Sequence, residues 1–261
     1  MAPTLSHRVA AEALGTALLV LVGAGSVVAA LRAGGGEITY AGLGFVSLAF
    51  AIVVAVVVYG FGPVSGAHIN PVVTLALASS RRFPWREVVP YVVAQVLGAF
   101  AGALLIVSMF GTEATDLGLG ATVLSDGVPY WQGMVAEALG TFVLLFAVMA
   151  LAVDSRAPLG WAGLMIGLAV AAAILLIAPQ TGGSLNPART MGPYITLALF
   201  GESVPWSQLA LYWLGPLIGA VAAVLVYDVV AQTRAAGRPE AEETALEEPY
   251  TPAPAKERST S

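Results

Sequence analysis

The sequence has no cysteine and very little charge. None of the 261 residues is cysteine, which excludes disulfides and thiol chemistry. Only 10% of the residues are charged and 58% are hydrophobic, whereas a typical soluble domain has about 25% charged residues. The net charge of −5 says little about partners, because much of the charge lies in loops and in the C-terminal tail. No nucleic-acid partner is expected. This balance excludes an ordinary soluble domain and predicts an all-α membrane protein.

Six hydrophobic segments are long enough to cross a bilayer as helices. A hydrocarbon core of about 30 Å requires roughly 20 mainly apolar residues. The first run is also longer than the core of a signal peptide, so no cleavable signal is expected. The predicted spans cover residues 9–31, 39–60, 86–110, 131–153, 159–179 and 208–231.

Two glycine-bearing turns run into Asn-Pro between these spans. One is SGAHINPV at residues 65–72, and the other is TGGSLNPAR at residues 181–189. Asn is a favoured helix N-cap and Pro suits the first helical position. Because apolar residues follow each turn, each predicts a half-helix of about 15 Å that enters the membrane and returns. Irregular backbone at that depth is tolerated where protein shields it or where it lines a wet cavity.

The chain also repeats itself. The segment AEALGT at residues 11–16 recurs at residues 136–141. Each half, about residues 9–110 and 131–231, contains three spans and one half-helix in the same order. Three is odd, so the second half must be inverted, and the two half-helices are expected to meet near the membrane midplane.

The arginines predict the orientation of the chain in a plasma membrane. A cytoplasmic N-terminus, residues 1–8, satisfies the positive-inside rule. Residues 232–261 contain six acids, four bases and several prolines, and are predicted to be a disordered cytoplasmic tail. This orientation leaves Arg32 and Arg189 toward the outside and places these arginines inside: Arg8, Arg81, Arg82, Arg86 and Arg156.

These features together resemble the aquaporin (major intrinsic protein) family: paired Asn-Pro motifs in inverted halves, an Ala-Glu-x-x-Gly-Thr opening in each half, and Arg after the second motif. The resemblance covers about residues 5–230. It implies a passive water channel that excludes protons and ions, works as a homotetramer in the lipid bilayer, and needs no cofactor. The first motif departs from the family pattern in having Val72 where Ala is usual, which would shift the midplane aperture slightly.

The resemblance assigns the centre of the pore to Asn70 and Asn186. Their amides would donate to a passing water while the half-helix N-termini repel cations. The alternative is that both are only N-caps. The resemblance also places Arg189 at an outer constriction, and the alternative there is a structural charge satisfied by loop carbonyls.

The rest of the constriction carries over from the resemblance as Phe50, Ile174 and Gly183, which form the selectivity filter with Arg189. Strict water channels have His at the position of Ile174, and glycerol channels have Trp, Gly and Phe at the first three positions. The ring is therefore expected to be less polar and wider than a strict water filter, as in the mixed filters of some archaeal and plant vacuolar members. Thr190 and the pair Tyr212-Trp213 favour the water branch.

Two acids and one histidine lie at further positions that the resemblance assigns. Glu12 and Glu137 would accept hydrogen bonds from the re-entrant turns, and the alternative is that they carry protons. His68 would line the pore, and the alternative is a gate. The remaining pore-lining residues are Gly66, Ala67, Gly182 and Ser184.

The alternatives to water conduction are a glycerol or polyol facilitator, a gradient-coupled transporter and an adhesion protein. Ammonia, hydrogen sulfide and carbon dioxide are further small solutes of a water channel. The sequence shows no metal-ligand cluster and no nucleophile–base–acid set, so neither a metal nor an enzyme is expected.

Overall fold

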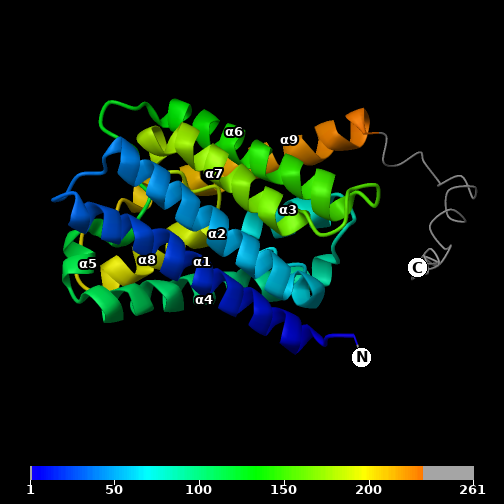
Figure 1. Ribbon diagram of the computed structural model, residues 1–261, viewed down its shortest axis with the longest axis horizontal. Helices are drawn as coiled ribbons and strands as arrows, with labels where there is room; N and C mark the ends of the chain where they lie inside the picture. The colour runs from blue at the N-terminus through cyan, green and yellow to red at the C-terminus, as the bar shows by residue number, and fades with distance from the viewer. Residues whose placement is uncertain (1, 232–261) are drawn as a thin grey trace, which may run out of the picture.

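The computed structural model describes residues 2–231, and these are helical with no strand. Six helical segments are long and apolar enough to cross a membrane, which confirms the predicted spans. They lie side by side as a bundle, with α1 beginning and α9 ending at the same end, to the right in Figure 1 and called the termini end below. The spanning helices are α1 (Leu5–Ala33), α2 (Tyr40–Ser65), α4 (Val88–Phe110), α6 (Tyr130–Val148), α7 (Ala162–Thr181) and α9 (Leu209–Val230).

Short elements extend or connect these helices. The half-helices are α3 (Pro71–Ser79) and α8 (Pro187–Leu199), and α6 continues into a π-helical turn, η3 (Met149–Val153). The loop between α4 and α6 contains α5 (Glu113–Asp116) and η2 (Gly118–Gly120), while η1 (Trp85–Glu87) and η4 (Trp206–Gln208) lead into α4 and α9. The predicted tail, residues 232–261, lies outside the described residues.

Two predicted boundaries are wrong by several residues. Helix α1 begins at Leu5, because Thr4 caps it and its polar first turns remain helical although their hydropathy falls. Helix α2 continues past residue 60 through Pro63 to Ser65, and ends at Gly66 in the left-handed conformation. Hydropathy marks where a helix becomes apolar and not where its hydrogen bonding begins or ends.

The two halves of the bundle pack through corresponding close contacts. Helix α4 crosses α1 where a Cβ at Gly98 would lie only 2.0 Å from the carbonyl oxygen of Ala13. Helix α9 crosses α6 in the same way, with 1.9 Å between such a Cβ at Gly219 and the oxygen of Ala138. Glycine is required at both crossings because any side chain would push the helices apart. The half-helices α3 and α8 enter the bundle from opposite ends (Figure 1), as expected of inverted repeats.

Candidate functional site

The two half-helices begin at residues that cap them in the same way. The Oδ1 atom of Asn70 accepts a hydrogen bond from the backbone N–H of Val72 at 3.0 Å. The Oδ1 atom of Asn186 accepts from Ala188 at 3.0 Å and from Arg189 at 3.3 Å. Val72 is fully buried and keeps this contact, so the departure from Ala leaves the cap intact.

The same amides also join the two halves of the chain. The Nδ2 atom of Asn70 donates to the carbonyl oxygen of Leu185, and Nδ2 of Asn186 donates to that of Ile69, both at 2.8 Å. Each amide nitrogen has two hydrogens. One hydrogen of each is therefore used in a reciprocal link between the halves, and the second is available to another acceptor.

Two buried carboxylates hold the turns that precede the half-helices. Glu12 accepts hydrogen bonds from the backbone N–H of His68 at 2.9 Å and of Ile69 at 2.7 Å. Glu137 accepts from the N–H of Ser184 at 2.9 Å and of Leu185 at 2.7 Å. Each carboxylate thus accepts from two consecutive backbone N–H groups of its turn.

These turns contain backbone conformations that side chains rarely adopt. Ala67, Ile69 and Leu185 have φ values of 48°, 42° and 58°. Left-handed backbone at a non-glycine residue is strained and persists where surrounding contacts determine it. The carboxylate contacts described above supply that constraint at Ile69 and Leu185, and the N–H of Ala67 donates to Oγ of Ser65 at 3.1 Å.

A central cavity of about 220 Å³ runs past these turns. A second cavity of about 620 Å³, called the vestibule, opens at the end opposite the termini. Only two of the described residues line both: Ile174 and Arg189. The lining of the central cavity includes Phe50, Gly66, Ala67, His68, Asn70, Ser184 and Asn186.

Arg189 is a buried cation with an incomplete set of partners. Its side chain is almost fully enclosed, and Nη1 donates to the carbonyl oxygen of Gly120 at 2.7 Å. Its guanidinium carbon lies 5.2 Å from the centre of the Phe50 ring, within cation–π distance. Among the described residues, Nε has no hydrogen-bond partner. The bond to Gly120 uses one of the five guanidinium N–H groups, so the guanidinium keeps further donors at the junction of the two cavities.

Gly183 lies beside this junction without lining either of the two cavities. Its φ is 63°, and an added Cβ would lie 3.3 Å from Cβ of Ala178 and 3.5 Å from Cγ1 of Ile174. Its neighbour Gly182 lines the vestibule instead. The absence of a side chain at position 183 leaves Ile174 as the apolar residue that lines both cavities with Arg189.

His68 lines the central cavity, and Thr74 and Phe83 contact its ring. Its Nδ1 atom lies 3.1 Å from Oγ1 of Thr74, and its ring meets that of Phe83 edge to face at 4.8 Å. The corresponding position in the second half, Ser184, donates to the carbonyl oxygen of Asn186 at 2.9 Å. Phe83 comes from the segment after α3 and was not predicted as part of the site.

The loop between α5 and α6 also contributes to the site without having been predicted. Besides Gly120, Thr122 contacts α8, because its hydroxyl shares a hydrogen bond of 2.8 Å with Thr190 and its carbonyl oxygen accepts from Tyr194 at 2.8 Å. These contacts use backbone oxygens and common hydroxyls, so no residue pattern in the sequence marks them.

Six spanning helices that enclose a cavity between two opposed half-helices define a polytopic membrane channel. Among residues 2–231, no group of three or more His, Asp or Glu side chains is placed to hold a metal. The chain belongs to the major intrinsic protein family, whose model matches residues 2–227.

The chain is similar to named aquaporins from archaea. It is 46% identical to a probable aquaporin AqpM of Archaeoglobus fulgidus, over 89% of this chain and 100% of that one. It is 43% identical to aquaporin AqpM of Methanothermobacter marburgensis, over 86% and 97% of the two chains. The crystal structure of the aquaglyceroporin from Plasmodium falciparum superimposes with a TM-score of 0.79 at 20% identity, covering 89% of this chain and all of that one, and shows the common fold. The protein is thus a membrane channel for water or small solutes.

Proposed function

We propose that this chain is a passive water channel that excludes protons and ions. The observation that carries the proposal is the junction between the two cavities, which is lined by the apolar side chain of Ile174 and by Arg189, whose guanidinium uses one N–H group on Gly120 and keeps further donors. A neutral molecule with an oxygen can accept a hydrogen bond there. A cation meets a buried positive charge, which makes its passage unfavourable.

Proton exclusion is assigned to Asn70 and Asn186 at the contact of the half-helices. Their remaining amide hydrogens would donate to the oxygen of a water molecule in the central cavity. The N-termini of α3 and α8 bring positive partial charge to the same place from opposite sides. A water held by these donors points its own hydrogens away from them, so the file of hydrogen bonds is interrupted where a proton would have to pass.

A glycerol or polyol facilitator is the second candidate function. Ile174 and Gly183 favour it, because Ile174 makes the ring less polar than His would and Gly183 removes a side chain from its wall. The aquaporin names of the archaeal relatives, together with Thr190 and the pair Tyr212-Trp213, support water. Ammonia, hydrogen sulfide and carbon dioxide are proposed as further permeant solutes.

The orientation and assembly belong to the same proposal. Arg8, Arg82 and Arg156 lie on segments at the termini end, which the positive-inside rule assigns to the cytoplasm. The protein would then lie in the plasma membrane with both termini inside. The exposed apolar helix faces would contact lipid and the other subunits of a homotetramer.

Paired water and glycerol fluxes in proteoliposomes test the function. Vesicles that contain the protein should shrink rapidly in an impermeant osmolyte and should not re-swell in glycerol. Rapid re-swelling would establish the facilitator instead. Shrinkage no faster than in empty vesicles would contradict both candidates, and a dependence of solute flux on a proton or sodium gradient would indicate a coupled transporter.

A further inference from the structure

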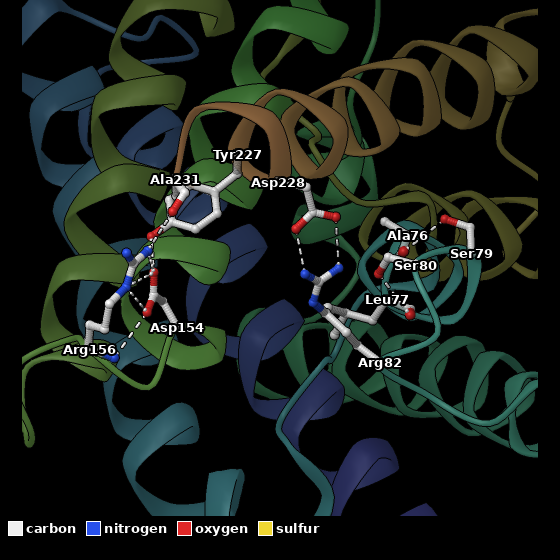
Figure 2. Close-up of polar contacts among 10 residues, drawn as sticks. All are labelled: Ala76, Leu77, Ser79, Ser80, Arg82, Asp154, Arg156, Tyr227, Asp228 and Ala231. Carbon is white, nitrogen blue, oxygen red and sulfur yellow. Dashed lines mark hydrogen bonds and ion pairs between the residues drawn. The ribbon is translucent and has the colours of Figure 1, made fainter. Parts of the chain in front are cut away.

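Two neighbouring residues in the last turn of α9 reach two different segments at the termini end (Figure 2). Successive residues of a helix point about 100° apart, since one turn takes 3.6 residues. Tyr227 therefore faces the segment after α6, while Asp228 faces the segment after α3. Each segment continues into residues at the wall of the central cavity.

Asp228 forms an ion pair with Arg82. The Nη1 atom of Arg82 donates to Oδ2 at 3.2 Å, and Nη2 donates to Oδ1. Both side chains are largely enclosed, with 21% of Arg82 and 6% of Asp228 exposed. The pair therefore fixes the segment that ends the half-helix, where Arg81 adopts a left-handed φ of 63°.

That segment contacts the pore wall on both sides of Arg82. The backbone N–H of Arg82 donates at 2.8 Å to the carbonyl oxygen of Leu77, whose side chain lines the central cavity. The next residue, Phe83, packs edge to face against His68. Movement of Arg82 would shift residues that define the cavity at this end.

Tyr227 holds the other segment. Its hydroxyl donates to Oδ2 of Asp154 at 2.8 Å, and Arg156 forms a two-pronged pair with the same carboxylate. The Nη2 atom of Arg156 also donates to the carbonyl oxygen of Ala231 at 3.0 Å, so the end of α9 is held twice (Figure 2).

Asp154 directly follows the π-helical turn η3. Its backbone N–H donates to the carbonyl oxygen of Met149 at 3.0 Å, which closes that turn. Ala152 and Val153, within the turn, line the central cavity. Such π-helical turns occur frequently at functional sites.

We propose that Tyr227 and Asp228 form a brace that sets the aperture of the pore at the termini end. They are positioning residues, because they act on the pore through Phe83 with His68 and through η3. The inference rests on the proposed water conduction. The resistances of successive sections of a pore to water flow add, so a mobile section at the termini end lowers the total flux. The choice of solute is still made at Ile174 and Arg189.

The chain offers a matched control for a purely structural role. Arg8 and Glu87 form an ion pair of 2.7 Å at the same end, with 27% and 7% of their side chains exposed. This pair joins α1 to η1, and neither residue lines either cavity. Loss of this pair should affect stability as loss of Arg82–Asp228 does, and its described hydrogen bonds and ion pairs involve no residue that lines the central cavity.

Water permeability per channel is the first measurement. Asp228→Asn, Arg82→Gln and Tyr227→Phe should each lower it by about threefold or more, the size of coupling found within one polar network. The glycerol-to-water ratio should not change. The double variant Arg82→Gln/Asp228→Asn should be no worse than either single one, which isolates the pair from other contacts of either side chain. Glu87→Gln should conduct as the unsubstituted chain does.

A thiol reporter gives a second measurement that does not depend on conduction. The chain has no cysteine, so Ala152→Cys introduces a single thiol at the mouth of the cavity. A membrane-impermeant thiosulfonate added at the termini end should modify it more slowly when Tyr227→Phe is also present, because the loosened turn moves into the cavity. Glu87→Gln should not alter the rate.

The outcomes separate the two proposals. If the unsubstituted chain conducts no water, the proposed function is wrong, and the thiol rates still decide on the brace. If the unsubstituted chain conducts water, and the brace variants match it both in water permeability and in the rate of thiol modification, the brace is wrong. An equal loss in Glu87→Gln would mean that general destabilisation is the cause, and would overturn the brace as well.

Discussion

Ile174 and Arg189 line both the central cavity and the vestibule, and no other described residue does. One is apolar and the other is a buried cation, so the proposed path of a solute passes two unlike side chains at this junction. In the proposed function, Arg189 supplies both the hydrogen-bond donor and the charge barrier, and Ile174 supplies an apolar surface. The first predictions concern these two residues.

Arg189→Val should weaken the exclusion of cations and protons. It removes the buried charge and the guanidinium donors and leaves an apolar side chain in their place. The proton leak across proteoliposomes should rise by about tenfold or more, which corresponds to a barrier lowered by roughly 1.4 kcal/mol. A pH-sensitive dye inside the vesicles measures this leak, and water permeability serves as the control for folding. An unchanged leak in a conducting variant would count against Arg189 as the charge barrier.

Ile174→His should make the channel more selective for water over glycerol. The imidazole adds a polar donor to the junction that positions 174 and 189 both line. The ratio of glycerol to water permeability should fall, as measured by re-swelling and shrinkage of the same vesicles. Ile174→Val, which only removes a methyl group, should leave the ratio unchanged or raise it. A rise in Ile174→His would show that the solute is selected elsewhere.

Mercurial reagents should not block the unsubstituted channel, because the chain has no thiol for them to attack. Ile174→Cys places one at the junction of the two cavities, so block should appear in that variant and be reversed by an added thiol. The measurement is water permeability before and after the reagent. Thiol-reversible block of the unsubstituted chain would contradict this reasoning.

The helices and the capped turns could be predicted because their signals are local. A long apolar run indicates a span, and Asn followed by Pro indicates a helix start, so Asn70 and Asn186 needed no distant partner to be found. The repeat then predicted that the two turns meet. The boundaries of α1 and α2 were missed since polar residues and Pro63 continue the hydrogen bonding of each helix beyond its apolar stretch.

The partners of the predicted residues could not be found in this way. Asn70 donates to a backbone oxygen 115 residues away, and every residue has such an oxygen. The same applies to Gly120, which anchors Arg189, while Phe83 is an ordinary aromatic residue until the fold places it behind His68. Contacts made through backbone atoms or through packing leave no pattern in one sequence.

Between about pH 5 and 8, titration of Asp154 should not change the water permeability. The hydrogen bond and charge of Arg156 lower the pKa of Asp154 below its usual range. A depressed pKa means that the contact stabilises the fold above the unfolded pKa of about 3.9 and is lost only as pH falls through the lower folded value. Stopped-flow shrinkage over this pH range measures the effect, and Tyr227→Phe should show the same flat profile at a lower level. A step in the pH profile of water permeability that disappears in Asp154→Asn would contradict the lowered pKa of Asp154.

Glu137→Gln should destabilise the protein more than Glu12→Gln, although both residues support corresponding turns. A glutamine at either position directs an amide group at a backbone N–H of the turn and leaves that donor unpaired, at a cost of about 1–3 kcal/mol. At position 12 the new amide has a compensating acceptor. Gln95 donates from Nε2 to Glu12 at 2.8 Å, and its Oε1 atom has no partner among the described residues, so a flip of the Gln95 amide turns that oxygen toward the new donor. No such glutamine contacts Glu137, whose described partners are Thr181, Ser184 and Leu185.

The free energy of unfolding in detergent compares the two variants directly, since each removes one buried charge and the two desolvation effects cancel in the comparison. Adding Gln95→Leu to Glu12→Gln should remove the compensation and bring its stability down toward that of Glu137→Gln. Equal losses in the two single variants would show that the Gln95 amide does not flip.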